Sequence, residues 1–292
     1  MQDIATLLFL GAIWGAAFPL MKVAAGEFGP LAMVGIRIGL AALVLLPFTV
    51  SHKNWRIIRS RPWAFFFVGF TACGASFPLL TYATLHLGAG VGAILNGLTP
   101  IFTSLIAWVW LKQRISTRQI IGIAVAWLGV AFLASSRQSG GAAFTQGHLM
   151  DAEHILPFLA ALLATFIYGA SANLAKVFLD GVSPTLISGG ALIFAATMDF
   201  PLAVFFWPAE MPSFSAWVCV AILGLVCTAL AYILYFRLVE RIGISRAISV
   251  TFLVPAFGLA WGAIFLNEVI SLQKMGAAGL ILAGTALINV RK

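Results

Sequence analysis

Two prolines within long apolar stretches each follow a polar side chain by four residues. Pro100 follows Asn96, and Pro255 follows Thr251. A proline inside a helix removes one backbone hydrogen bond and leaves the carbonyl four residues earlier without its usual donor. Within lipid, such a break is tolerated only where it faces protein or a water-filled cavity. We therefore expect Pro100 and Pro255 either to act as paired hinges beside a polar cavity or to form kinks capped by local side chains.

Aromatic and polar side chains recur at helical spacing in the surrounding stretches. Residues three, four or seven positions apart share one face of a helix, and Pro78, Tyr82 and His86 form one such stripe. A cavity walled by aromatic rings, with a few hydroxyls and one amide, suits an amphipathic small molecule. For Tyr82, an aromatic belt at the membrane surface is the alternative. The residues expected to contact such a molecule are Trp14, Phe18, Tyr82, Asn96, Thr99, Tyr168, Tyr232 and Thr251.

The composition is that of a membrane protein. Of the 292 residues, 62% are hydrophobic and 9% are charged, whereas a soluble domain carries about 25% charged residues. This excludes a water-soluble enzyme, a disordered chain and a disulfide-rich secreted domain. The net charge of +8 is interpreted as an orientation signal, because lysine and arginine collect in cytoplasmic loops. We expect the lipid bilayer as partner and no nucleic acid.

Apolar runs of about 20 residues predict ten membrane-spanning helices in two groups of five. The fold class expected is an all-α integral membrane protein. Residues 1–135 form the first five-helix repeat, 136–153 a linker loop and 154–292 the second repeat. The predicted spans are 4–24, 30–50, 63–85, 89–111 and 119–135, followed by 156–177, 184–207, 215–238, 245–266 and 272–290.

The two halves resemble each other at a nearly constant offset. A shift of 154 residues places Trp14 on Tyr168 and Lys22 on Lys176, and a shift of 155 places Pro100 on Pro255. Similarity at a fixed period marks duplicated units. Because five spans per half is an odd number, the two copies must be inverted relative to each other.

The distribution of positive charge agrees with this inversion. Residues 51–62 carry four cations, whereas 208–214, the equivalent loop of the second half, carry none. With both termini in the cytoplasm, 13 of the 17 lysines and arginines fall on the inner side, as the positive-inside rule requires. We therefore expect a multi-pass protein of the cell inner (plasma) membrane with both termini cytoplasmic.

Charged residues inside the predicted spans are few. Arg37 and Asp199 lie at similar depth, which permits an ion pair between them. No aspartate or glutamate lies near the midpoint of a span, where a proton-coupled carrier usually has one. The four histidines lie in loops or at span ends, and the three cysteines lack the spacing of metal ligands. We therefore expect no metal, no cofactor and no catalytic residue.

Three stretches resemble the EamA family of the drug/metabolite transporter superfamily: residues 10–15, 253–268 and 276–284. The likeness covers nearly the whole chain. The length and aromatic content of the chain are similar to those of YddG-type exporters of aromatic amino acids. The resemblance implies a transporter of two five-helix halves. One departure is Lys112-Gln113-Arg114, which stands where a Gly-Glu pair is usual and counts against a transport role for Glu268.

Inverted repeats with a midplane site are common in secondary transporters. The sequence therefore predicts an alternating-access carrier, facilitative in mechanism, that exports small amphipathic metabolites such as aromatic or neutral amino acids. The alternatives are a proton-coupled drug/metabolite exporter, a channel, or a polytopic membrane enzyme. Glycines at G-x-x-x-G spacing, such as Gly11 and Gly15, favour packing within the bundle, with a monomer or a weak homodimer as the expected state.

Overall fold

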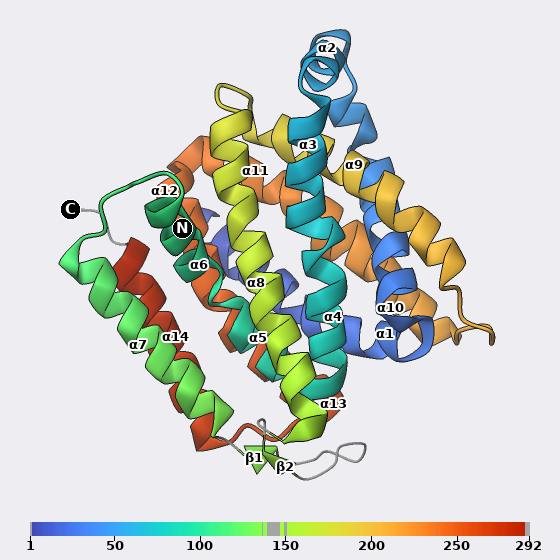
Figure 1. Cartoon of the computed structure of the whole chain (residues 1–292). Helices are drawn as coiled ribbons and strands as arrows, with labels where there is room; N and C mark the ends of the chain where they lie inside the picture. The colour runs from blue at the N-terminus through green and yellow to red at the C-terminus, as the bar shows by residue number, and fades with distance from the viewer. Residues whose placement is uncertain (1, 136, 139–146, 149–150, 290–292) are drawn as a thin grey trace.

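The computed structural model describes residues 2–135, 137–138, 147–148 and 151–289, and nearly all of its regular structure is helical (Figure 1). Strands β1 (Arg137–Gln138) and β2 (Gly147–His148) form a two-residue antiparallel ladder inside the predicted linker. The helices of the first half are α1 (Gln2–Thr49), α2 (His52–Ser60), α3 (Pro62–Gly69), η1 (Phe70–Gly74), α4 (Ser76–Leu87), α5 (Ala89–Asn96), α6 (Thr99–Val109) and α7 (Thr117–Ala134). Those of the second half are α8 (Ala152–Phe178), α9 (Pro184–Phe205), α10 (Phe214–Gly224), η2 (Leu225–Leu230), α11 (Ala231–Ile242), α12 (Ile244–Ala247), η3 (Ile248–Phe252), α13 (Leu253–Leu266) and α14 (Leu272–Asn289).

Eight helical stretches of the described residues are long and apolar enough to cross a membrane, and Leu272–Ile288 is a shorter apolar helix. The first stretch, α1, has 48 residues, which is roughly 70 Å of helix and more than twice the hydrocarbon thickness. Gly29 interrupts it with a φ of 73° and a ψ of 160°. Glycine adopts positive φ without steric cost, and Pro30 then starts a new helix. The helix thus consists of two segments that correspond to the predicted spans 4–24 and 30–50.

Backbone irregularities recur 155 residues apart. The π-helices η1 and η2 begin at Phe70 and Leu225. Gly88 has a φ of 97° and Gly243 a φ of 81°, and both have a ψ close to 158°. The two non-glycine residues with positive φ in the described chain, Lys112 and Asn267, have φ of 53° and 52°. Each of these features therefore has a counterpart in the other half.

The helices of the two halves pack against one another. Helix α1 contacts α9, α10 and α13 of the second half, and α7 lies along α14 (green and red in Figure 1). A Cβ atom on Gly15 would overlap Phe257 and the backbone of Gly258, so α1 and α13 approach at backbone distance. Close by, the indole Nε1 of Trp261 donates to the carbonyl of Ala12 at 3.0 Å. The Gly11–Gly15 face thus packs within the chain.

Candidate functional site

A cavity of about 430 Å³ lies where α1, α4, α8 and α11 meet the irregular segments between α5 and α6, at η2 and at η3. Its walls are aromatic, with hydroxyl groups and one side-chain amide among them. Its volume is in the range of small-ligand sites. The principal lining residues are Trp14, Phe18, Met21, Arg37, Phe77, Asn96, Thr99, Pro100, Thr103, Ser104, Tyr168, Ser171, Ser188, Thr228, Tyr232, Tyr235 and Thr251.

The structure brings together seven of the eight residues that the sequence nominates as contacts. Trp14 packs on Tyr235 with ring centroids 5.5 Å apart, and Phe77 on Tyr168 at 6.5 Å. Tyr82 is the exception: it lies outside this lining, and its ring packs on His86 with centroids 4.4 Å apart. The nominated residues that line the cavity are Trp14, Phe18, Asn96, Thr99, Tyr168, Tyr232 and Thr251.

Helix α4 presents Phe77 and Leu80 to the cavity instead of Tyr82. The π-helix η1 lies directly before α4. A π-turn holds an extra residue, so it rotates the face that the following helix presents. The predicted stripe of Pro78, Tyr82 and His86 lies wholly within α4, so its spacing is helical, but spacing does not say which face of α4 meets the cavity. Nothing in the residue types of Phe70–Gly74 signals this turn.

The predicted break beside Pro100 is present. Helix α5 ends at Asn96, and α6 begins at Thr99 with Pro100 in its first turn. The amide of Gly97 donates to Ile94 at 3.0 Å, which tightens the end of α5. The carbonyl of Asn96 accepts a hydrogen bond from the Thr99 hydroxyl at 2.9 Å. The segment therefore both lines the cavity and carries a local cap.

The equivalent segment of the second half has a different shape. Thr251 belongs to the 3-10 helix η3 and lines the cavity, whereas Pro255 lies in the first turn of α13, outside the lining. A proline in the first turn needs no backbone N–H and starts a helix readily. Both prolines thus lie in the first turn of a helix that follows irregular backbone.

Arg37, on the second segment of α1, lies at the cavity with only 6% of its surface exposed. Its Nε donates to the Thr228 hydroxyl at 3.0 Å, and its Nη1 donates to the Met21 sulfur at 3.3 Å. The Phe77 ring lies 4.4 Å from the guanidinium carbon. Sequence reasoning identified Arg37 by its charge and depth but not its place in the cavity wall.

Arg37 and Asp199, whose similar depth permits an ion pair, form none among the described residues. The ion pairs among the described residues are Lys22–Glu268 and Arg241–Asp3. Asp199 is 2% exposed, and its Oδ2 has no hydrogen-bond partner in the described chain. Similar depth along two spans is thus not sufficient, because the pairing also depends on how each helix is rotated.

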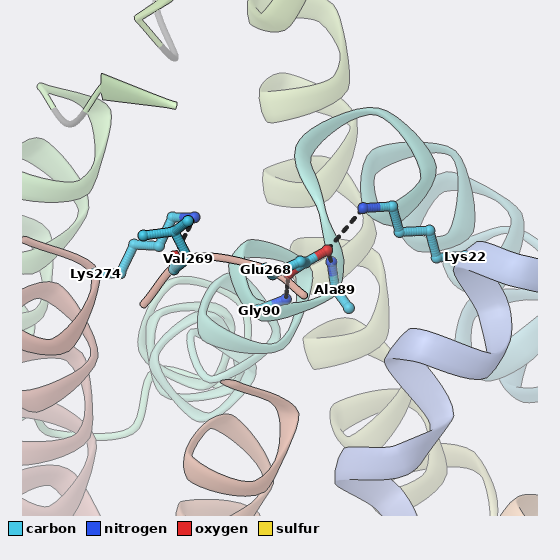
Figure 2. A network of polar contacts seen from close by, with 6 residues as sticks. All are labelled: Lys22, Ala89, Gly90, Glu268, Val269 and Lys274. Carbon is cyan, nitrogen blue, oxygen red and sulfur yellow. Dashed lines mark hydrogen bonds and ion pairs between the residues drawn. The ribbon is translucent and has the colours of Figure 1, made fainter. Parts of the chain in front are cut away.

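A polar network centred on Glu268 joins Lys22 of α1 to the start of α5 (Figure 2). The Lys22 ammonium contacts Glu268 Oε1 at 2.7 Å. The same carboxylate accepts the backbone N–H groups of Ala89 at 2.8 Å and Gly90 at 3.0 Å. Glu268 therefore caps the start of α5, where helix N–H groups lack partners. Sequence reasoning assigned Glu268 no such role.

Glycine is required at the turn before this cap. Gly88 has a φ of 97°, and a Cβ atom there would lie 2.9 Å from Glu268 Oε1. Glu268 lies in the loop between α13 and α14, where burial raises its pKa. Lys22 and the two amides outweigh that effect and hold the pKa of the carboxyl below its ordinary value. The carboxylate is therefore charged at neutral pH.

A second cavity of about 410 Å³ adjoins the first and shares Thr103, Ser104 and Ala172 with it. Arg114 and Lys176 lie in its wall. The first cavity thus adjoins a space with two cationic side chains in its wall. Across the described residues, no cluster of three His, Cys, Asp or Glu side chains could hold a metal ion.

The sequence model of the EamA-like transporter family matches residues 3–135 and again residues 155–290. The chain belongs to the EamA-like transporter family. It is a membrane protein with several apolar helices, and this family and the relatives below are transporters rather than enzymes.

Three relatives match over nearly their whole length. The "Probable terminal-alkyne amino-acid exporter" of Streptantibioticus cattleyicolor is 26% identical over 95% of this chain and 90% of its own. The transporter YvbV of Bacillus subtilis is 24% identical over 98% and 90%. The inner membrane transporter YedA of Escherichia coli is 23% identical over 98% and 90%. A solved crystal structure shares the fold with a TM-score of 0.65 and 17% identity, covering 96% of this chain and 94% of its own.

Proposed function

We propose that the protein is an alternating-access carrier that exports small amphipathic metabolites, such as neutral or aromatic amino acids. The observation that carries this proposal is the aromatic cavity at the broken helix between α5 and α6. Irregular backbone at a wet cavity between two repeats is the usual site of a secondary carrier. A relative named as an amino-acid exporter agrees with the substrate class.

We infer ten spans arranged as two inverted repeats, residues 1–135 and 154–292, joined by the linker 136–153. The two matches to one family description support the duplication. Asp3 and Lys22 lie roughly 30 Å apart along α1, about the hydrocarbon thickness. Arg241, two residues before Gly243, pairs with Asp3, whereas Gly88 lies against the Lys22–Glu268 pair. Equivalent turns at opposite ends of the first segment of α1, which ends at the break at Gly29, are what inversion requires.

We infer that the described state is open towards the cytoplasm of an inner-membrane protein, with both termini on that side. The adjoining cavity carries Arg114 and Lys176, which the positive-inside rule assigns to the cytoplasm. The Lys22–Glu268 pair then closes the outer end. Pro100 and Pro255 are the proposed hinges, because each lies in the first turn of a helix that follows irregular backbone. A monomer or weak homodimer suffices, since the cavity is complete within one chain.

Substitutions in the cavity wall test the proposed site. Asn96→Ala and Tyr232→Ala are each expected to lower solute uptake into proteoliposomes about tenfold, because each removes hydrogen-bonding groups from the cavity. Tyr82→Ala, which removes the same side chain outside the lining, is the matched control and should keep normal uptake. Wild-type rates in both cavity variants, with normal membrane insertion, would show that the solute binds elsewhere.

Energy coupling separates the two candidate mechanisms. We propose facilitative transport. Asp199 is the residue that carries the proton-coupled alternative, because its buried Oδ2 has no hydrogen-bond partner among the residues that the structure describes. A facilitative carrier is expected to show the same initial uptake rate with and without a pH gradient across the liposome membrane. Large stimulation by the gradient, lost in Asp199→Asn but kept in Glu210→Gln, would establish the proton-coupled mechanism instead.

A further inference from the structure

Arg37 is the single charged side chain among the described residues that line the cavity. It is 94% buried from solvent, since only 6% of its surface is exposed. Arginine keeps its proton under all ordinary conditions, so it cannot escape burial by becoming neutral. A buried charge without a counter-charge costs free energy, and natural proteins retain one mainly where it has a function.

The partners of Arg37 in the described chain are all neutral. They are the Thr228 hydroxyl, the Met21 sulfur and the Phe77 ring. The two ion pairs of the described residues involve other cations, and Asp199 does not line the cavity. Among the described residues, therefore, no carboxylate pairs with the positive charge in the cavity wall.

The guanidinium group is held ready for a planar anion. It has five N–H donors, of which Nε and Nη1 each use one here. Three donors remain, including both on Nη2, and a pair of them can supply the two parallel N–H groups of the fork that matches a carboxylate. Phe77 covers one face of the guanidinium group. Thr228, which belongs to the π-helix η2, is itself fixed because its hydroxyl donates to the carbonyl of Leu223 at 2.8 Å. The orientation is thus set before any ligand binds.

We propose that Arg37 binds the carboxylate of the transported solute, so that the carrier accepts amphipathic carboxylic acids, including amino acids, in preference to the corresponding amides and amines. This inference rests on the proposed carrier function. The aromatic wall around Trp14 and Phe18 would accommodate the apolar part of the same molecule. Cationic amphipathic compounds would meet the Arg37 charge and be excluded.

Matched competitors in a counterflow assay test this assignment. Proteoliposomes holding the full-length protein take up labelled L-phenylalanine, L-leucine or 3-phenylpropionate in separate reactions. Each acid competes against its amide, and phenethylamine serves as the cationic probe. For the wild type, the acid should compete at least about tenfold better than its amide, which is the preference expected for one charge-assisted hydrogen-bonded contact. Arg37→Met should abolish that preference, and Arg37→Lys should keep part of it.

Two controls separate binding from folding. Arg118→Met removes an exposed cation of α7 outside the cavity and should leave the preference unchanged. The melting temperature of Arg37→Met without solute should equal or exceed that of the wild type, because an unbalanced buried charge is removed. A purely structural arginine would instead lower the melting temperature and reduce uptake of acid and amide equally.

The outcomes distinguish this inference from the function on which it rests. Saturable wild-type uptake with no preference for acids, or an unchanged preference in Arg37→Met, overturns the role of Arg37 and leaves the carrier function standing. Absence of saturable uptake for every acid, amide and amine overturns the proposed function and the carboxylate site together. A preference that disappears in Arg37→Met and persists in Arg118→Met supports both.

Discussion

Replacing Glu268 by alanine is expected to lower the free energy of unfolding by roughly 3 kcal/mol, because it removes one partner of a mostly buried ion pair. Lys22 and Glu268 are 14% and 13% exposed, so solvent screens the pair only in part. The loss also leaves the N–H groups of Ala89 and Gly90 without their acceptor. Lys22→Met should cost about 1 kcal/mol, since Glu268 then keeps both amide donors. Unfolding by SDS titration in mixed micelles measures both values.

The exposed carboxylate Glu210 provides the control, and Glu210→Ala should change stability by no more than about 0.5 kcal/mol. The double charge swap Lys22→Glu with Glu268→Lys should not restore stability, because a lysine cannot accept from the α5 amides. Equal costs for Lys22→Met and Glu268→Ala would contradict the assignment of Glu268 as a helix cap.

The same network gives a pH dependence with a defined sign. The pKa of Glu268 is lower in the folded protein than its ordinary value, so the unfolded chain binds the proton more readily. The stability contributed by Glu268 is therefore complete above the ordinary glutamate pKa of about 4.3. It is lost as the pH falls through the lower, folded-state pKa. Glu268→Gln should flatten this acid branch of the curve.

Gly15→Ala is expected to destabilise the protein by roughly 2 kcal/mol, although alanine favours helix more than glycine does. The added Cβ would overlap Phe257 and lie 2.9 Å from the amide nitrogen of Gly258, so α1 and α13 would have to separate. Backbone atoms of a packed helix cannot move aside as the end of a flexible side chain can. Thermal unfolding in detergent, followed by loss of monodisperse protein, measures the effect.

Gly26→Ala is the matched control on the same helix, because a Cβ there meets nothing within 4 Å. It should leave stability unchanged or raise it by up to about 1 kcal/mol through helix propensity. Similar melting temperatures for the two variants would mean that α1 and α13 do not approach as closely as described.

Several features follow from local physical chemistry and are therefore predictable from the sequence. Long apolar runs specify helices, because lipid cannot satisfy unpaired backbone groups. The proline at position 100 interrupts its span, because a proline has no N–H to donate. Gly29 and Pro30 separate the two segments of α1, because glycine adopts positive φ freely and proline readily starts a helix. The eight contacts nominated from residue type and helical spacing include seven that line the cavity.

The remaining features depend on helix rotation and on contacts between distant parts of the chain. Helix α4, which follows the π-helix η1, presents Phe77 rather than Tyr82 to the cavity. The π-helix η2 carries Thr228, which orients Arg37 across 191 residues of sequence. No spacing rule anticipates these turns, because a π-turn leaves no signature in residue type.

The membrane-embedded helices, the duplicated halves and seven residues of the cavity wall are predictable from the sequence, since these depend on hydrophobicity, backbone donors and helical period. Which charged side chains meet depends instead on how the helices pack. Arg37 donates to Thr228 and forms no ion pair with Asp199. Glu268 pairs with a lysine 246 residues away and also caps α5. Such pairings are set by how each helix is rotated and packed, and neither quantity is encoded in the spacing of residues along one helix.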